Sequence, residues 1–374
     1  MLPLGNKPIM EHVIRALAAN DIKDLVVVVG YQKERIMDHF GDGIRYGVKI
    51  EYAFQDEQLG TANALNKARL FIDGSFLVLN GDNLVDARAI GDILAADGKN
   101  VILAALREET ADYGVLIVEE GDVTDIIEKP GRPCTGILNT GIYRFGQDIF
   151  DELDATPISD RGSYELTQTI THMIDNGRDI RAEITGAVWA DAIFAWDLLD
   201  ANNSALHLLE PKIEGLIEEG AWYRGPVAIG EDSVVRSGSY LVGPVAIGKN
   251  CDIGPNVTLL PATSIGDSVR IGSHSEIRNS IVMGGSRIGA GSVVASTVLG
   301  ANSSFGDQLI VEANPSMPIV EGELHRAEFG AVVADNVSVG SRVFMHPGTI
   351  VGTGARIGSG TTVRGMIERD CRVI

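Results

Sequence analysis

The first feature with chemical potential is an aspartate at the end of an apolar run. Residues 75–84 read Ser-Phe-Leu-Val-Leu-Asn-Gly-Asp-Asn-Leu, so Gly81 and Asp82 directly follow the apolar stretch. Buried strands of parallel α/β sheets read as short apolar runs, and ligands lie beyond their carboxyl ends. Any sheet may end in a turn of this composition, so the pair is weak evidence alone. We predict that Asp82 is a metal ligand.

Two further segments offer groups for ligand binding. Gln55 to Ala62 lies between a predicted strand and a predicted helix, where Gly60 lets the backbone approach a flat ligand and Thr61 can cap the helix. The start of a helix favours anions. A plain capped turn is the commoner explanation of such a segment. A second carboxylate, Asp191, follows an apolar strand end, and in isolation it reads as an ordinary N-terminal helix residue.

Three short polar sets flank short strands farther along the chain. They are Tyr113-Gly114-Val115, Glu128-Lys129-Pro130 and Asn139-Thr140-Gly141. Each can hydrogen-bond sugar hydroxyls or phosphate oxygens. For Glu128 and Lys129 the alternative is a solvated pair on a turn, which is the commoner fate of adjacent opposite charges.

The overall composition limits the classes of function. The formal charge is −20, from 51 acidic and 31 basic side chains, which argues against nucleic-acid binding because phosphate contacts need concentrated Lys and Arg. Three cysteines without C-x-x-C spacing indicate a reducing compartment and no structural zinc site. No apolar run reaches the ~18 residues that a membrane span needs, and the first residues do not resemble a secretory signal. We therefore expect a cytoplasmic protein.

The elements that must position these residues alternate between helix and strand up to about residue 215. Apolar periodicity predicts helices over 9–19, 32–40, 61–71, 87–96, 164–176 and 196–209. Strands are expected over 25–29, 49–54, 75–79, 101–106, 115–119, 125–128 and 137–145. This alternation predicts an α/β domain, residues 1–215, with a mostly parallel sheet.

Beyond residue 215 the chain becomes a repeat with a period of six residues. Single apolar residues recur at Ile229, Val235, Leu241, Ile247, Ile253, Leu259, Ile265, Ile271 and Ile277, and again at Val333, Val339, Met345, Val351, Ile357 and Val363. This pattern predicts a hexapeptide β-helix over 222–374, because the apolar positions of stacked coils form one core. A Gly-rich disordered tail would lack this much Ile and Val. Residues 303–330 interrupt the period and are expected to form an inserted loop, either a binding surface or a plain surface excursion.

Seven short motifs in order give the chain a family resemblance. They are Q-x-x-x-x-G-T, G-D, Y-G-V, E-K-P, N-T-G, Y-E-L-T (Tyr164 to Thr167) and W-x-D, followed by the hexapeptide repeats. In this order they resemble the sugar-1-phosphate nucleotidylyltransferases, particularly the archaeal bifunctional type. This resemblance implies an N-terminal α/β nucleotidyltransferase domain with a Rossmann-like mixed sheet, followed by a C-terminal left-handed β-helix. The resemblance implies attack of a sugar 1-phosphate on the α-phosphorus of a nucleoside triphosphate, with release of pyrophosphate and a requirement for Mg²⁺.

The resemblance also implies roles for individual residues. Asp82 and Asp191 match the two metal-binding carboxylates. Gln55 and Gly60 match positions that read the nucleobase, with Thr61 and Gly81 beside the nucleotide. The sugar phosphate is expected to contact Gly114, Glu128, Lys129 and Asn139.

This chain departs from the family pattern at its start. The family's first strand and its loop G-x-G-T-x-x-R, followed by a P-K pair, are absent, and Met1 to Pro8 match the residues that come after the P-K pair. We expect that the natural protein is longer. The alternative is a non-catalytic regulatory or scaffold member of the family.

A second departure affects the β-helix. The His and Tyr of the related acetyltransferases fall on Ala290 and Val293, and a later Lys falls near Glu328, although Asn314 is a match. His274, His325 or His346 would have to replace the missing base. The third possibility, amino sugar-1-phosphate N-acetylation, is therefore weaker, and we expect the β-helix to build a homo-oligomer, a trimer or a dimer of trimers. Gln55 in Q-L-G-T points mildly to UTP or dTTP, and glucose 1-phosphate and N-acetylglucosamine 1-phosphate are the first sugar candidates.

Overall fold

The computed structural model describes residues 2–107, 113–128, 135–159, 162–320 and 322–374. Contacts within the chain divide it into two compact units. The N-terminal unit comprises Ile9–Trp189, and the C-terminal unit comprises Leu2–Pro8 together with Ala190–Ile374. None of the described helices combines the length and apolarity needed to cross a membrane.

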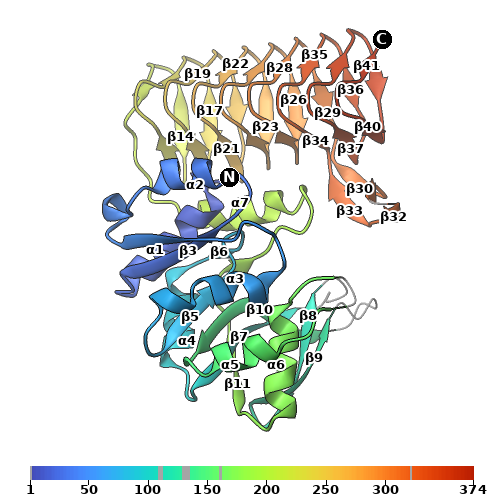
Figure 1. Ribbon diagram of the computed structural model, residues 1–374. Coiled ribbons are helices and arrows are strands. Elements are labelled where there is room, and N and C mark those ends of the chain that lie inside the picture. Colours follow the sequence, from blue (N-terminus) through green and yellow to red (C-terminus); the bar gives the residue numbers. More distant parts are fainter. Residues whose placement is uncertain (1, 108–112, 129–134, 160–161, 321) are drawn as a thin grey trace. The chain divides into compact units, whose positions relative to one another are not determined.

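The N-terminal unit is built on a six-stranded sheet with the strand order β5-β10-β7-β11-β9-β8. In chain order the strands are β5 (Phe76–Leu79), β7 (Asn100–Arg107), β8 (Gly114–Glu119), β9 (Asp122–Glu128), β10 (Gly136–Phe145) and β11 (Ile180–Thr185). The helices of the unit are α1 (Ile9–Ala19), α2 (Lys33–Phe40), α3 (Thr61–Lys67), α4 (Ala87–Ala95), α5 (Ile149–Ala155) and α6 (Leu166–Asp175). The expected α/β architecture is present (Figure 1).

The expectation of a mostly parallel sheet is wrong. Within the six-stranded sheet only β7 and β11 pair in parallel, whereas β10 runs antiparallel to both β5 and β7. β5, α4 and β7 do follow one another as a strand-helix-strand unit, which leaves the two strands pointing the same way. Because β10 is inserted between them, each of these two strands pairs with β10 in antiparallel orientation.

Two strands that were expected to be buried have an open edge among the described residues. β5 pairs only with β10, and all four of its side chains are half-buried. β3 (Asp24–Val29) pairs only with β4 (Lys49–Phe54), in a separate two-stranded parallel sheet, and most of its side chains are likewise half-buried. The apolar side chains of both strands are therefore only partly covered by the residues that the structure describes.

One helix is shorter than the sequence predicts. α3 ends at Lys67 and continues as a 3₁₀ turn over Arg69–Phe71. Leu70, which lies within the predicted helix over 61–71, is 96% exposed. The tighter 3₁₀ winding rotates the side chains that follow Ala68 away from the face of the α-helix.

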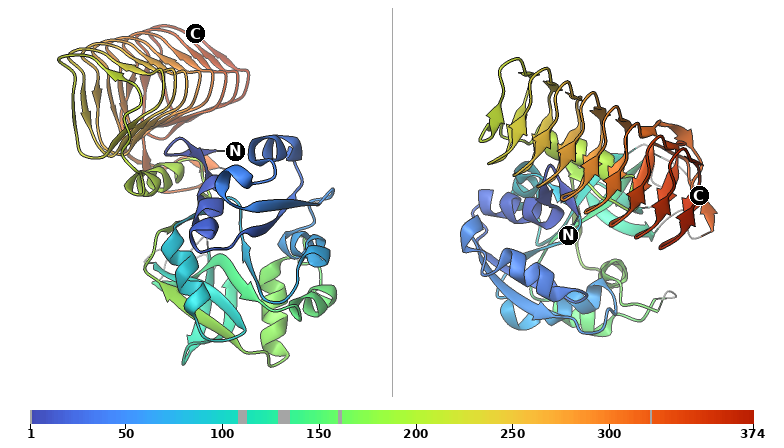
Figure 2. Two further views of the ribbon diagram at one scale, coloured as in Figure 1. Left: turned by 90° about the vertical axis from the view of Figure 1, so that its left-hand side faces the viewer. Right: turned by 90° about the horizontal axis from the view of Figure 1, so that it is seen from above.

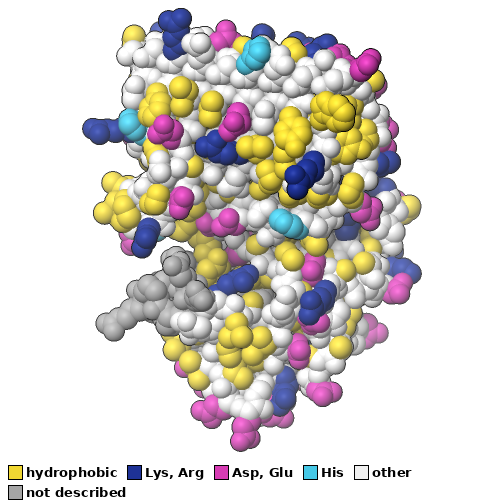
Figure 3. Space-filling view, turned by 180° about the vertical axis from the view of Figure 1, so that it is seen from behind, with side chains coloured by type: hydrophobic (Ala, Val, Ile, Leu, Met, Phe, Trp, Pro, Cys, Tyr) yellow, Lys and Arg dark blue, Asp and Glu magenta, His cyan; other side chains and the backbone are white. Residues whose placement is uncertain are grey.

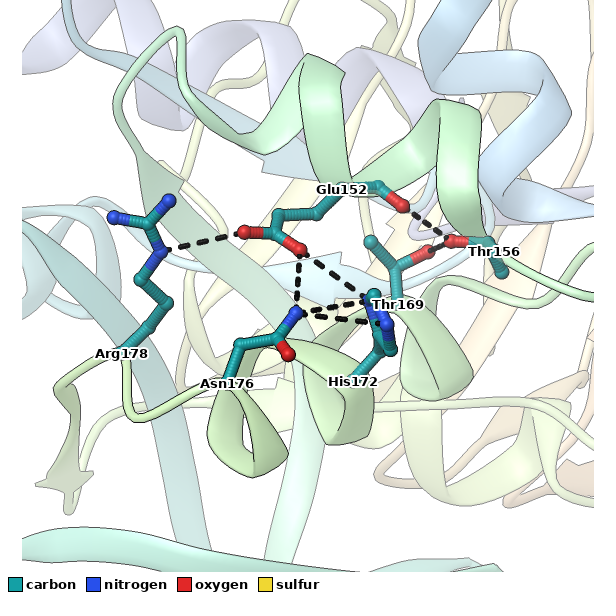
Figure 4. A network of polar contacts seen from close by, with 6 residues as sticks. All are labelled: Glu152, Thr156, Thr169, His172, Asn176 and Arg178. Atoms are coloured by element: carbon teal, nitrogen blue, oxygen red, sulfur yellow. Dashed lines mark hydrogen bonds and ion pairs between the residues drawn. The ribbon is translucent and has the colours of Figure 1, made fainter.

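The helices α5 and α6 are joined through one buried carboxylate. Glu152 on α5 is 7% exposed and accepts hydrogen bonds from Asn176 Nδ2 at 3.1 Å and Arg178 Nε at 3.3 Å (Figure 4). His172 Nδ1 on α6 lies 3.3 Å from the same carboxylate. Buried carboxylates need such partners, so Glu152 fixes the end of α6.

The C-terminal unit contains the predicted parallel β-helix. Its strands form three parallel sheets of nine, eight and eight strands, and the coils stack regularly in Figure 2. The first sheet contains β13 (Leu216–Ile217), β16 (Val234–Val235), β19 (Asp252–Ile253), β22 (Arg270–Ile271), β25 (Arg287–Ile288), β28 (Ser304–Phe305), β35 (Ser338–Val339), β38 (Arg356–Ile357) and β41 (Arg372–Val373). The second contains β14 (Trp222–Arg224), β17 (Tyr240–Val242), β20 (Thr258–Leu259), β23 (Glu276–Arg278), β26 (Val293–Ala295), β29 (Ile310–Val311), β36 (Phe344–Met345) and β39 (Thr362–Val363). The third contains β15 (Val227–Ile229), β18 (Val245–Ile247), β21 (Thr263–Ile265), β24 (Ile281–Val282), β27 (Val298–Leu299), β34 (Ala331–Val333), β37 (Thr349–Val351) and β40 (Met366–Ile367).

The apolar residues of the period line one continuous core. Ile253, Leu259 and Ile265, on three different sheets of the coil, are each 0% exposed. An apolar residue that recurs every six positions therefore points into the core once on each of the three faces of a coil. The sequence identified these positions because the period depends only on local geometry.

The inserted segment is shorter than expected. Val234, Asp252 and Arg270 lie side by side and are 18 residues apart, whereas Arg270, Arg287 and Ser304 are 17 apart. The loss of one residue per coil breaks the six-residue spacing after Ile277 without breaking the coil. β28 and β29 thus belong to the stack, and the excursion comprises β30 (Asn314–Ser316), β31 (Ile319–Val320), β32 (Glu323–Leu324) and β33 (Ala327–Phe329).

A buried amide fixes the first residues of the chain within this unit. Asn202, on α7 (Leu198–His207), is 0% exposed, and its Oδ1 accepts from Gly5 N at 2.9 Å and from Ser264 Oγ at 2.8 Å. Its Nδ2 donates to the Ala262 carbonyl at 3.1 Å. The hairpin of β1 (Pro3–Leu4) and β2 (Lys7–Pro8) is therefore attached to α7 and the β-helix.

Candidate active site

The Gly81-Asp82 turn lies beside a bulge in β10. The register of β10 against β7 shifts between Asn139 and Ile142, inside the N-T-G motif. Gly141 has φ 75°, and a Cβ there would lie 2.6 Å from Asn80 Nδ2. Only glycine meets both conditions without strain, so the N-T-G motif is shaped to approach the turn that carries Asp82. Asp82 itself is exposed.

One carbonyl connects three of the motifs. The Thr140 carbonyl accepts hydrogen bonds from Asn83 Nδ2 and from Trp189 Nε1, both at 2.9 Å. These three residues are 1%, 2% and 4% exposed, respectively. The Thr140 hydroxyl donates to the Leu103 carbonyl of β7 at 2.6 Å. The G-D, N-T-G and W-x-D motifs therefore meet at one buried point, and Asp191 follows Trp189 by two residues in the chain.

The residues predicted to contact the sugar form a second cluster. Gly114 of β8 stands opposite Glu128 of β9, and a Cβ on Gly114 would lie 3.0 Å from Glu128 Oε2 and 3.7 Å from Asn139 Cβ. Asn139 Nδ2 donates to the hydroxyl of Tyr143 at 2.9 Å. Burial, with a further contribution from Glu128, raises the pKa of Tyr143, so its hydroxyl stays protonated. Lys129 lies outside the described residues.

The predicted base-reading residues form a third cluster with the Y-E-L-T motif. Gln55 Nε2 donates to the Gly60 carbonyl at 3.0 Å and to Asn63 Oδ1 at 3.1 Å. Gly60 has φ 106°, and a Cβ there would lie 2.3 Å from the carbonyl oxygen of Tyr164. The backbone closes the contact, since Ala62 N donates to that oxygen at 2.9 Å.

The hydroxyl of Thr61 caps a helix other than the expected one. Thr61 is the first residue of α3, which has no side-chain cap at its N-terminus. Its Oγ1 instead accepts from Leu166 N, the first residue of α6, at 3.0 Å. Thr61 thus joins the Q-x-x-x-x-G-T and Y-E-L-T motifs, which are far apart in the sequence.

Comparison with known proteins agrees with this arrangement of motifs. Residues 1–207 match the family described as nucleotidyl transferase, and residues 241–367 match the GMPPB C-terminal domain. The chain belongs to the nucleotidyl transferase family. The bifunctional protein GlmU of Methanococcus maripaludis is 35% identical over 99% of this chain and 90% of its own length. That of Methanocaldococcus jannaschii is 34% identical over 99% and 90%. A glucose-1-phosphate thymidylyltransferase from Streptomyces antibioticus is 32% identical over 96% and 86%.

The sequence did not single out Arg107 in this nucleotidyl transferase. Arg107 ends β7, and its Nη2 donates to the Trp189 carbonyl at 3.1 Å while its guanidinium lies 6.0 Å from the centre of the Trp189 ring. Tyr113 of the Y-G-V motif packs edge-on against the same ring at 5.9 Å. The only signal for Arg107 in the sequence is that a basic residue stands at the carboxyl end of a predicted strand. Arg107 places a positive charge beside the buried motif junction.

The donor atoms fit a hard cation better than zinc. Among the described residues no group of three or more His, Cys, Asp or Glu side chains converges on one point. Mg²⁺ needs only one or two carboxylates because phosphate oxygens and water complete its coordination. Asn83 Oδ1, next to Asp82, is buried and has no hydrogen-bond partner among the described residues. Near Asp191, burial raises the pKa of Asp197 to about 6, with Asp200 and Asp191 adding to the effect.

The β-helix holds a groove at the position of the missing acetyltransferase base. The groove has a volume of about 790 Å³, and His274, Ala290, Gln308 and Arg342 are among the residues that line it. The other two candidate histidines are engaged elsewhere. His325 lies with its ring 4.5 Å from that of Phe194, and His346 packs edge-on against Phe344 at 4.9 Å. Glu328, near which the Lys position of the related acetyltransferases falls, lies in β33, and Val293, at the Tyr position, lies in β26.

The contact between Gly60 and Tyr164 gives a first prediction. Gly60→Ala should lower the free energy of unfolding by at least about 2 kcal/mol more than Gly74→Ala, because a positive φ alone costs ~1–3 kcal/mol and Gly60 adds a backbone clash. Gly74 is the matched control, since its φ is 75° and a Cβ there meets nothing within 4 Å. Chemical denaturation measures both variants. Equal losses of unfolding free energy in the two variants would contradict a close contact between Gly60 and Tyr164 in the folded protein.

Proposed function

We propose that the chain transfers a nucleotidyl group from UTP or dTTP to a sugar 1-phosphate, with release of pyrophosphate. The main support is the junction at the Thr140 carbonyl, which gathers the G-D, N-T-G and W-x-D motifs in a chain of the nucleotidyl transferase family. Glucose 1-phosphate with dTTP is the first pair to test, because the Streptomyces antibioticus relative is a glucose-1-phosphate thymidylyltransferase.

Each group of residues binds a different part of the two substrates. Gln55, Gly60 and Thr61 hold the nucleobase, since the carboxamide of Gln55 is fixed by two hydrogen bonds from its Nε2. Gly81 allows the triphosphate to approach the backbone. Gly114, Glu128 and Asn139 bind the sugar hydroxyls, and Lys129 binds its phosphate. Arg107 supplies positive charge where two anions must meet.

A divalent cation, Mg²⁺, is held by Asp82 and Asp191. Their carboxylates are hard oxygen donors, and Asn83 Oδ1 beside Asp82 is an oxygen that no described residue pairs. Bound there, the cation supplies charge neutralisation for the phosphate groups. Asn83 and Trp189 hold the chain on either side of the junction, so their role is to orient the two aspartates.

An additional strand would account for the open edges of β3 and β5. Both strands are half-buried along apolar runs, and an additional strand would pair with their free backbone groups and cover their side chains. We propose that a longer form of the protein supplies this strand with its G-x-G-T-x-x-R loop. Reading the codons upstream of Met1 tests the proposal, because an in-frame motif supports it and an immediate stop codon favours the non-catalytic alternative.

We further propose that the β-helix forms a homo-oligomer, a trimer or a dimer of trimers. On its second sheet, one outward row in register includes Trp222, Tyr240, Thr258, Glu276, Val293, Ile310 and Phe344, of which all but Thr258 and Glu276 are apolar. Trp222 is 71% and Tyr240 43% exposed. Apolar side chains also gather over the β-helix on the face drawn in Figure 3. Aligned apolar side chains of this kind are typical of protein interfaces.

The groove at His274 keeps acetyl transfer as a second candidate function. A base of suitable pKa is needed to deprotonate an attacking amine, and His274 lines the groove next to Ala290. Since Ala290 and Val293 replace the related His and Tyr, we expect no acetyl transfer from acetyl-CoA to glucosamine 1-phosphate. Turnover that is lost in His274→Asn and retained in His346→Asn would instead establish the groove as an active site.

Removing the carboxylate of Asp82 tests the main proposal. Asp82→Asn should lower the turnover number about 100-fold or more, in the range seen when one electrostatic stabiliser of a transition state is removed. Its melting temperature should be unchanged because Asp82 is exposed. Pyrophosphate release with Mg²⁺ is measured on the chain and on an upstream-extended form, with Asp97→Asn as an exposed control. Wild-type turnover in Asp82→Asn contradicts the proposal.

The oligomer is tested by disrupting the outward row. Trp222→Ser combined with Tyr240→Ser should convert the oligomer to a monomer, because it removes two aligned aromatic side chains from the interface. Light scattering gives the mass in solution. Leu216→Ser, on the first sheet and 58% exposed in the wild type, is the control and should leave the mass unchanged. A monomeric wild-type protein would disprove the proposed assembly.

A further inference from the structure

The excursion from the β-helix forms a bent hairpin, which we call the arm (residues 314–329, apart from 321). β30 pairs antiparallel with β33, and β31 pairs antiparallel with β32 (Figure 1). Ser316 Oγ donates to the Ala327 carbonyl at 3.1 Å across the base of the hairpin. The arm is therefore an ordered structure with its own hydrogen bonds.

Aromatic rings connect the arm to the segment that follows Asp191. The ring of Trp196 is stacked on that of Phe194 at 4.6 Å and on that of Phe329 at 5.0 Å, with interplanar angles of 14° and 11°. The ring of His325 lies 4.5 Å from that of Phe194. Two rings thus come from residues 194–196 and two from the arm. Offset-stacked and edge-to-face aromatic pairs of this kind stabilise a contact beyond the area that they bury.

The two sides of this contact differ in secondary structure. Phe329 ends β33 and is 0% exposed, and its carbonyl accepts from Gly348 N of the next coil at 3.1 Å. Residues 191–197, by contrast, lie outside helices and strands, with bends and turns over 193–197 before α7 begins. Within this segment Phe194 N donates to Asp197 Oδ2 at 2.7 Å, which closes one turn. Phe329 therefore gives the rings of Phe194 and Trp196 a partner that is anchored in the coils.

We propose that Phe194, Trp196 and Phe329 are positioning residues for Asp191. The inference rests on the proposed role of Asp191 as a cation ligand. A ligand on an irregular segment must be held to within about 0.5 Å by its supporting contacts, and loss of such support typically weakens cation binding about 10- to 100-fold. The ring stack is one support between this segment and the coils, beside the hydrogen bonds that join Asn202 of α7 to Ala262 and Ser264.

Hydrogen exchange tests the mechanical part of the proposal in the full chain. Trp196→Ala should speed amide exchange of residues 190–197, and Trp196→Phe should restore the wild-type rate because it keeps a stacking ring. His325→Ala attacks the contact from the arm and should speed exchange in the same segment. Leu324→Ser is the matched control, since Leu324 is on the arm, 62% exposed and outside the stack. Circular dichroism confirms that each variant is folded.

The functional part is tested by the cation dependence of pyrophosphate release. In Trp196→Ala the Mg²⁺ concentration for half-maximal rate should rise about tenfold, with little change in the KM for sugar 1-phosphate, and Trp196→Phe should return it to near the wild-type value. Unchanged exchange in Trp196→Ala, or faster exchange with an unchanged Mg²⁺ dependence, would overturn the proposal. Full turnover in Asp191→Asn would instead contradict the proposed function, and the exchange experiment would still show whether the arm holds the segment.

Discussion

The candidate site depends on the carbonyl oxygen of Thr140. It accepts two donors from side chains that are distant in sequence, Asn83 and Trp189, and all three residues are almost completely buried. A buried donor left without its acceptor costs ~1–3 kcal/mol, so the bulge in β10, the turn after β5 and the approach to Asp191 must form together. Thr140 lies within the bulge, outside the regular pairing of β10 with β7, so its carbonyl can accept these side-chain donors.

The same bulge changes the side-chain pattern of β10, which lies between β5 and β7. A strand that runs antiparallel to both neighbours would ordinarily present its side chains in simple alternation. The register shift between Asn139 and Ile142 changes this locally, and glycine at 141 lets the backbone approach Asn80. The site is therefore built where the sheet departs from regularity, as is common for bulges near functional sites.

Local patterns predicted much of this structure, and long-range pairing limited the prediction. The six-residue period identified the core of the β-helix because each position has a fixed direction in a coil. The strand order was not predictable in the same way, since the insertion of β10 between β5 and β7 depends on contacts between distant segments. The motifs gave candidate residues in order, but not that Thr61 caps α6 or that Arg107 contacts Trp189. The ring stack on Trp196 joins residues with no shared sequence pattern, so only the structure brings it to light.

Charge places a further constraint on the site. The chain carries a formal charge of −20, yet the proposed reaction brings together two anions. Distant acidic residues matter little, because salt screens exposed charges beyond ~8–10 Å. What counts is the charge at the site, where Asp82 and Asp191 would be balanced by a divalent cation and Arg107 contributes one positive charge. A triphosphate and a sugar phosphate together carry more negative charge than these groups offset.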